Sequence, residues 1–173
     1  MTQPNGICNS SVMTRFGRYY IAASHHGVMA ISRSPIQCKP KMPISASIRK
    51  RALAHLRYGA RALTLYLSGK RISFKHLSFD LRGYSDFQRA VYEALRKVPY
   101  GEIRSYKDLA KDAGAPKASR AVGSAMKKNR IPILLPCHRI IETSGCLGGY
   151  SGGLSLKKRL LAMEQTTPSG ECK

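Results

Sequence analysis

The sequence predicts an α/β protein in two parts, a small antiparallel sheet with one helix and then a mainly helical region. β-Prone residues and turn signals fill residues 12–32, whereas from residue 47 apolar residues recur at three- and four-residue steps. With 173 residues, 43% of them hydrophobic, the chain can form one large domain or two small ones. We place an N-terminal domain at residues 1–80, a linker at 81–84 and a C-terminal domain at 85–173.

The N-terminal half is expected to begin with a loose tail, residues 1–10, and a hairpin. Its strands are residues 12–23 and 28–32, and residues 24–27 form the turn. Prolines make residues 34–43 a loop. An amphipathic helix follows from Ser47 to Gly69, with its basic residues on a solvated face, and residues 72–79 are read as a third strand.

Two serines predict where helices begin in the C-terminal half. Ser85 with Gln88, and Ser105 with Asp108, each fit a capping box. The helix from Ser105 stops at Gly114, and Pro116 suits the first turn of the next helix. These two short helices are a candidate helix-turn-helix, and the second one combines small residues with cations. A helix hairpin with a merely solvated basic face is the alternative.

Charge is the strongest compositional signal. The chain has 30 Lys and Arg against 9 Asp and Glu, a net charge of +21, which indicates a polyanionic partner such as nucleic acid. Charge that serves solubility alone is the competing interpretation. No acid precedes Asp80, so the N-terminal half cannot supply the carboxylate cluster of a metal-dependent nuclease or polymerase. The basic residues are spread along the chain, which disfavours a membrane-binding segment.

A thiol, an imidazole and a guanidinium stand together at Cys137, His138 and Arg139. The apolar run 131–135 reads as a buried strand that Pro136 ends. A histidine near a cysteine is a common way to form a nucleophilic thiolate near neutral pH. Adjacent residues on a strand point apart, so the pair can cooperate only through a turn or a relaying water. A structural cysteine beside a surface histidine is the alternative.

The segment Pro136-Cys137-His138-Arg139-Ile140 resembles the signature of the DNA alkyltransferases that repair O6-alkylguanine, the methylated-DNA–protein-cysteine methyltransferases. The resemblance runs from Phe87 to Glu164 and includes Val98-Pro99-Tyr100-Gly101-Glu102, Ser105-Tyr106, Ser119-Arg120-Ala121-Val122-Gly123, Asn129 and residues 147–154. It implies a ribonuclease-H-like N-terminal domain and a C-terminal domain with a helix-turn-helix. It also implies an enzyme that flips the damaged base and transfers its alkyl group irreversibly to Cys137. Because the thioether is stable, each molecule would act once, and O4-alkylthymine is a further candidate substrate.

The same resemblance assigns roles to individual residues. Glu164 orients His138, which acts through water to deprotonate Cys137, while Asn129 braces the cysteine segment and Tyr106 donates to the flipped guanine. Arg120 fills the space that the base leaves, with the helix in the minor groove. The remaining DNA contacts fall to Ser105, Gly123, Ser124 and Lys127, and the alkylguanine pocket to Pro136, Ile140, Tyr150 and Ser151.

From the residues alone, plainer roles stay open. Arg120 would be a phosphate contact, Tyr106 a packing residue, and residues 148–153 a flexible glycine loop. Glu164 follows Leu160 and Leu161 on an apolar helix face, where it is either a paired buried carboxylate or a side chain that reaches water at a helix end. A DNA-binding module without chemistry and a cysteine hydrolase are the rival functions.

We expect no cofactor, and double-stranded DNA carrying alkylated guanine as the partner of a monomer. Neither a leader peptide nor a bilayer-spanning stretch is apparent, so we expect a soluble, cytoplasmic protein with no membrane partner, or a nuclear one in a eukaryote. Five scattered cysteines suit a reducing compartment. The spacing of Cys8, His25, His26 and His76 matches no compact zinc motif, and a disulfide between Cys8 and Cys38 stays open.

Overall fold

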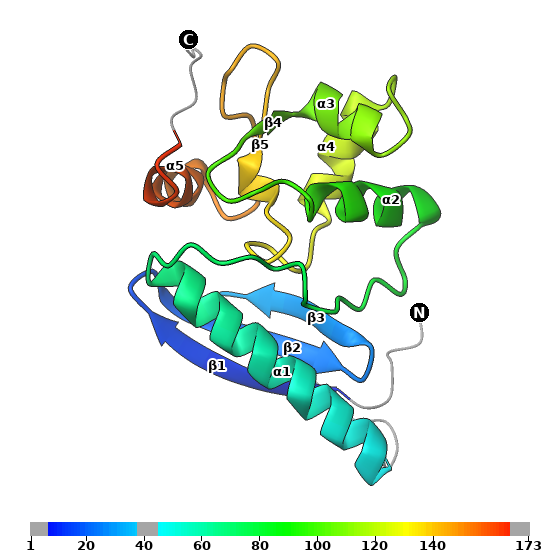
Figure 1. The fold of residues 1–173 in the computed structure, drawn as a ribbon, viewed down its shortest axis with the longest axis vertical. Helices are drawn as coiled ribbons and strands as arrows, with labels where there is room; N and C mark the ends of the chain where they lie inside the picture. Colours follow the sequence, from blue (N-terminus) through cyan, green and yellow to red (C-terminus); the bar gives the residue numbers. More distant parts are fainter. Residues whose placement is uncertain (1–6, 38–44, 167–173) are drawn as a thin grey trace. The chain divides into compact units, whose positions relative to one another are not determined.

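The computed structural model describes residues 7–37 and 45–166. They form a mixed α/β structure that divides into two compact units (Figure 1). The first unit runs up to Gly83 and takes in Arg130–Leu134; the second comprises Tyr84–Asn129 and the chain from Leu135 onward. No helix in these described ranges is long and apolar enough to cross a membrane.

The first unit contains a three-stranded antiparallel sheet in the order β1-β2-β3, made of β1 (Cys8–Thr14), β2 (Gly17–Ser24) and β3 (Gly27–Ser32). The prediction of one strand over residues 12–23 is wrong, because the chain turns between Thr14 and Gly17. The Thr14 hydroxyl accepts from the Phe16 amide at 3.1 Å, and Gly17 has a φ of +96°, which glycine tolerates. Cys8 to Ser10, predicted as tail, belong to β1; residues 1–6 and 38–44, with Cys38, lie outside the described residues.

Helix α1 (Ala46–Leu67) lies across this sheet (Figure 1) and confirms the predicted amphipathic helix. Ser45 caps it by accepting from the Ile48 amide. Its buried residues are Ala52, Leu56, Gly59, Leu63, Tyr66 and Leu67. Gly59 is the point of closest approach, since a Cβ there would lie 2.6 Å from Val28 Cγ2 and 2.9 Å from Ile21 Cδ1.

The predicted third strand, residues 72–79, is not a strand. Only Phe79 pairs with the sheet, through an isolated parallel bridge to Val28. A turn closed by the Leu77 amide on the Phe74 carbonyl at 3.0 Å interrupts the segment, while Phe74 packs edge-on against Tyr66. The apolar residues of this segment therefore report burial rather than an extended backbone.

The second unit is mainly helical. Its elements are α2 (Asp86–Leu95), β4 (Arg104–Ser105), α3 (Tyr106–Asp112), α4 (Ser119–Lys127), a 3₁₀ turn η1 (Cys137–Arg139), β5 (Ile140–Ile141) and α5 (Leu154–Met163). The capping box at Ser85 is confirmed, and Ser105 caps α3 by accepting from the Asp108 amide at 3.1 Å. Helix α4 begins at Ser119, later than Pro116 suggested, because residues 115–118 form a separate turn closed by the Ala118 amide on Ala115.

The apolar run 131–135 is buried, as expected, but it is not a strand. Ile133 adopts a φ of +76°, which an extended strand cannot contain. The Ile31 amide donates to the Arg130 carbonyl at 2.7 Å, and Arg130–Leu134 group with the first unit. The run is therefore a buried turn between Asn129 and Leu135.

We predict that Gly59→Ala destabilises the protein although alanine is the better helix former. The new Cβ would overlap Val28 and Ile21, and overpacking of this kind costs about 1–3 kcal/mol against a helix-propensity gain of about 1 kcal/mol. Urea unfolding measures the change in the free energy of unfolding. The control is Ala60→Gly at the neighbouring, half-exposed position, which changes helix propensity alone. A Gly59→Ala variant more stable than the original chain would contradict the close packing.

Candidate active site

Cys137, His138 and Arg139 form the single 3₁₀ turn η1, and all three side chains are buried, with 4%, 0% and 3% exposed. The Arg139 amide donates to the Pro136 carbonyl at 3.0 Å and closes the turn. A turn here was one of the two ways, with a relaying water, in which the sequence allowed the thiol and the imidazole to cooperate. The alternative of a surface histidine is excluded.

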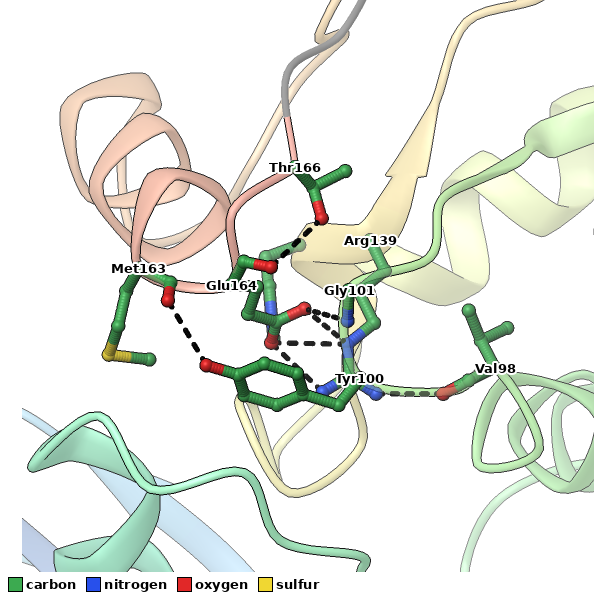
Figure 2. A network of polar contacts seen from close by, with 8 residues as sticks. Val98, Tyr100, Gly101, Arg139, Met163, Glu164 and Thr166 are labelled. Atoms are coloured by element: carbon green, nitrogen blue, oxygen red, sulfur yellow. Dashed lines mark hydrogen bonds and ion pairs between the residues drawn. The ribbon is translucent and has the colours of Figure 1, made fainter.

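Glu164 ends α5 with its carboxylate 3% exposed, facing this turn. His138 Nε2 lies 3.1 Å from Glu164 Oε1. Arg139 donates from Nη2 to Oε1 at 2.9 Å and from Nε to Oε2 at 3.0 Å, and the Gly101 amide donates to Oε2 at 3.1 Å (Figure 2). Burial would raise the pKa of Glu164, but the hydrogen bonds and charges of His138 and Arg139 outweigh it and hold this pKa at about 2. Glu164 is thus a fully paired buried anion, not a solvated helix end.

Arg139 ties this carboxylate to the turn after α2. Its Nη1 donates to the Val98 carbonyl at 2.7 Å, and the Tyr100 hydroxyl donates to the Met163 carbonyl at 3.1 Å (Figure 2). The sequence shows the cation at residue 139 but does not indicate its partner. No sequence pattern links residue 139 to residue 164, so this ion pair emerges only from the fold.

The side chain of Asn129 is hydrogen-bonded to the thiol of Cys137. Asn129 Nδ2 donates to Sγ at 3.1 Å and to the Leu135 carbonyl at 3.0 Å, so this amide spans the buried turn 130–134. Burial raises the pKa of Cys137 to about 11, and the Asn129 hydrogen bond opposes that rise. In this structure the thiol is therefore protonated at neutral pH, so a base must remove its proton before it can act as a nucleophile.

His138 is held as a neutral imidazole. Burial lowers its pKa most, the charges of Arg139 and Lys157 lower it further, and Glu164 opposes them. With Nε2 facing an ionised carboxylate, the hydrogen-bond network assigns the ring proton to Nε2 and leaves Nδ1 as the basic nitrogen. The ring can accept a proton, and Glu164 stabilises the imidazolium that results.

A cavity of about 350 Å³ opens beside Cys137. Its lining brings together Tyr106, Gly123, Met126, Lys127, Cys137, Gly149, Tyr150 and Ser151. The Tyr106 hydroxyl donates to the Gly149 carbonyl at 3.4 Å, and burial, followed by Cys137 and Glu142, raises the Tyr106 pKa, so the phenol keeps its proton. The cavity combines a thiol, a hydroxyl donor and an exposed ammonium.

Two residues predicted for this pocket lie elsewhere. Pro136 and Ile140 do not line the cavity: Pro136 precedes η1, and Ile140 pairs with Arg104 in the two-stranded parallel sheet. Both are buried and flank the reactive turn. Their sequence proximity to Cys137 did not translate into contact with the cavity, because the chain enters and leaves η1 through the protein interior.

The predicted DNA contacts lie on and beside α3 and α4. Arg120 and Lys127 are exposed at the two ends of α4. Gly123 faces the Tyr106 ring, and Ser124 is exposed with its hydroxyl donating to the Arg120 carbonyl at 3.3 Å. Ser105 instead serves as the cap of α3, and its hydroxyl donates to Asp108 at 2.7 Å.

Lys157 was missed by the sequence analysis. It is fully buried, and its ammonium donates to the Ile140 carbonyl at 2.5 Å and to the Leu147 carbonyl. Burial lowers its pKa to about 8, while the charges of Cys137 and Glu142 oppose that change. A signal existed: Lys157 precedes Leu160 and Leu161 by three and four residues, which places it on the same apolar face as Glu164.

The residues considered for zinc do not assemble into a site. Among the residues that the structure describes, no three His, Cys, Asp or Glu side chains gather as a metal would require. His25 and His26 lie with ring centroids 4.0 Å apart, and Cys8 is a free thiol.

Comparison with known proteins relates this geometry to a family. Residues 86–166 match the family model described as "6-O-methylguanine DNA methyltransferase, DNA binding domain". A methylated-DNA–protein-cysteine methyltransferase of Mycolicibacterium paratuberculosis is 52% identical over 103 residues, which cover 60% of this chain but only 61% of that relative. The inducible methylated-DNA–protein-cysteine methyltransferase of Bacillus subtilis is 36% identical over 168 residues, covering 92% and 91% of the two chains.

Solved structures agree over most of the chain. The crystal structure of Mycobacterium tuberculosis OGT in complex with DNA superposes with a TM-score of 0.73 at 33% identity, over 92% of this chain and 94% of that one. The match extends well beyond the second unit and takes in the sheet and α1 region. The chain therefore belongs to the methylated-DNA–protein-cysteine methyltransferase family.

Proposed function

We propose that the protein repairs alkylated DNA by moving the alkyl group of O6-alkylguanine to Cys137 Sγ, with O4-alkylthymine as a further candidate substrate. One observation carries this proposal: the cavity of about 350 Å³ opens onto a thiol held by Asn129, beside a neutral imidazole backed by the Glu164 anion. The arrangement follows the nucleophile, base and orienting group of covalent catalysis.

The chemistry can be written with these groups. His138 accepts the Cys137 proton through a water, and Sγ attacks the alkyl carbon as the bond from that carbon to guanine O6 breaks. The electron pair of the broken bond passes to the purine, whose negative charge is stabilised by a hydrogen bond from the Tyr106 hydroxyl. The proton that His138 accepted returns through water to the purine, and Tyr150 and Ser151 line the space around the base. Asn129 favours the thiolate through its hydrogen bond. The product is a thioether, so each molecule reacts once, and these steps require no cofactor.

For DNA engagement, we propose that α3 and α4 act as a helix-turn-helix that enters the minor groove. A base in a duplex must leave the stack before Sγ can reach it. Arg120, exposed at the start of α4, would occupy the vacated space, while Gly123, Ser124 and Lys127 approach the backbone and Ser105 holds the start of α3. Residues 116–139 contain six Lys or Arg and no acid, and these local cations attract phosphate.

We also propose a domain organisation, a cellular location and a DNA partner. We take the sheet with α1 as a ribonuclease-H-like N-terminal domain over residues 1–80, joined by residues 81–84 to a C-terminal domain over 85–173. The protein would act as a cytoplasmic monomer, or in the nucleus of a eukaryote, on double-stranded DNA. The likeness to the DNA-bound M. tuberculosis structure supports DNA as the partner.

Incubation with a duplex that carries O6-methylguanine tests the proposed function. We expect each chain to gain the mass of one methylene on the Cys137 peptide and to stop at one equivalent. Cys137→Ser should gain no mass yet still bind the duplex, because the serine preserves the shape of the site. If the unaltered protein, with its thiol reduced, binds the duplex without gaining mass, it is a damage-binding module and not an alkyltransferase. Repeated turnover on an ester would identify a hydrolase.

The role of Asn129 gives a prediction about pH. Removing its hydrogen bond in Asn129→Ala should raise the pKa of Cys137 further, so less thiolate forms at any pH below that pKa. A hydrogen bond to a charged group is worth about 1.5–3 kcal/mol, so single-turnover methyl transfer at neutral pH should slow by about ten- to a hundredfold. Affinity for undamaged duplex is the control. An unchanged rate would show that Asn129 does not act on the thiol.

A further inference from the structure

The side of α1 that faces away from the sheet carries a stripe of cations. Lys50, Arg57 and Arg61 recur at seven- and four-residue spacings, all are exposed, and they lie opposite the buried Ala52 and Leu63. At a rise of about 1.5 Å per residue they span roughly 16 Å of the helix. A stripe of this length can follow the phosphates of a few nucleotides.

Nothing acidic in the same part of the chain neutralises this stripe. Residues 1–83 contain fourteen Lys and Arg and one acid, Asp80. That carboxylate is buried and already engaged: it accepts from the Ser24 hydroxyl at 2.5 Å and from Arg82 Nε and Nη2 at 2.8 and 2.7 Å. The cations of α1 therefore present an uncompensated positive surface that fits a polyanion.

An aromatic pocket borders the stripe. Arg51, His55 and Tyr58 follow one flank of α1, at four- and three-residue spacings. A cavity of about 180 Å³ opens there, lined by Val28, Ala54, His55, Tyr58, His76, Leu77 and Ser78. Tyr58 is 67% exposed, which is unusual for an aromatic ring.

This combination favours nucleic acid over an acidic membrane. A helix that lies on a membrane inserts an apolar face, but the apolar face of α1 is buried against the sheet. An exposed aromatic ring between cations is instead what a single strand requires, because its bases are unstacked and present a free π-face. A base within a duplex has no free face to stack on Tyr58.

We propose that α1 and the adjoining pocket form a second nucleic-acid-binding surface, which holds a single-stranded segment. Its phosphates lie along Lys50, Arg57 and Arg61, and one base stacks on Tyr58 beside His55 and His76. This surface belongs to the first unit and uses none of the residues assigned to alkyl transfer. It does not depend on the proposed function.

The first test compares two variants of the full chain that lose the same charge. One carries Lys50→Ala, Arg57→Ala and Arg61→Ala; the control carries Arg18→Ala, Lys97→Ala and Lys158→Ala, three exposed cations outside α1. Each binds a labelled oligothymidylate over a range of salt concentrations. Each lost phosphate contact lowers the slope of log affinity against log salt by about 0.7, so the α1 variant should lose about 2 units of slope and bind at least tenfold more weakly near 0.1 M salt. The control should bind nearly as the unaltered chain does.

The second test locates the base. An oligothymidylate containing 5-iododeoxyuridine is photo-crosslinked to the full chain, and the adduct is mapped by mass spectrometry. We expect a crosslink at Tyr58 that Tyr58→Leu abolishes. Single-turnover methyl transfer to a short duplex should be unchanged in both the α1 variant and Tyr58→Leu, which separates this surface from the alkyl-transfer site.

Three outcomes would overturn the proposal. Equal weakening in the α1 and control variants would show that net charge alone binds the strand. Crosslinks confined to the second unit would place the strand on α3 and α4. Loss of binding to phosphatidylserine vesicles by the α1 variant, with oligothymidylate binding intact, would assign the stripe to a membrane surface.

Discussion

The reactive centre depends on the pairing of the buried Glu164 carboxylate with Arg139 and His138. A charge in the interior is costly unless every lone pair is satisfied, and here Arg139, His138 and the Gly101 amide satisfy it together (Figure 2). Glu164 and its partners thus join three segments far apart in the sequence: the end of α5, the turn after α2 and the 3₁₀ turn of the cysteine. The Glu164 carboxylate therefore fixes the position of the turn that carries the Cys137 thiol.

The same burial sets the proton chemistry. It raises the pKa of Cys137 and lowers that of His138, so the resting pair is a thiol beside a neutral imidazole. Glu164 favours the imidazolium and Asn129 the thiolate, so each product of proton transfer has one dedicated stabilising partner. Because the resting thiol is uncharged, the protein does not bear the free-energy cost of an isolated buried thiolate. The thiolate and the imidazolium need to form only when substrate is present.

Sequence reasoning succeeded where local chemistry decides the structure. The cap at Ser85 and the helical period of α1 are encoded within one or two turns. The apolar positions around Glu164 left a buried carboxylate and a solvated helix end both open, and the structure shows the buried one. It failed where tertiary contacts choose the backbone. Ile133 and Phe74 are apolar and buried as a strand would require, yet both lie in turns, because hydrophobic periodicity reports burial and not φ. The carbonyl groups that accept from Arg139 and Lys157 could not be predicted either, because a pattern of side chains carries no information about backbone acceptors.

The stability of the original chain and of Glu164→Gln between pH 7 and pH 2, measured by urea unfolding, tests this account most directly. At pH 7 the variant leaves Arg139 buried without its anion, which should cost about 3–5 kcal/mol. Because folding depresses the pKa of Glu164 from 4.5 to about 2, its contribution is complete above pH 4.5 and is lost as the pH falls toward 2. The account predicts that the gap between the two proteins narrows over that window. A gap that is small at pH 7, or constant down to pH 2, would contradict it.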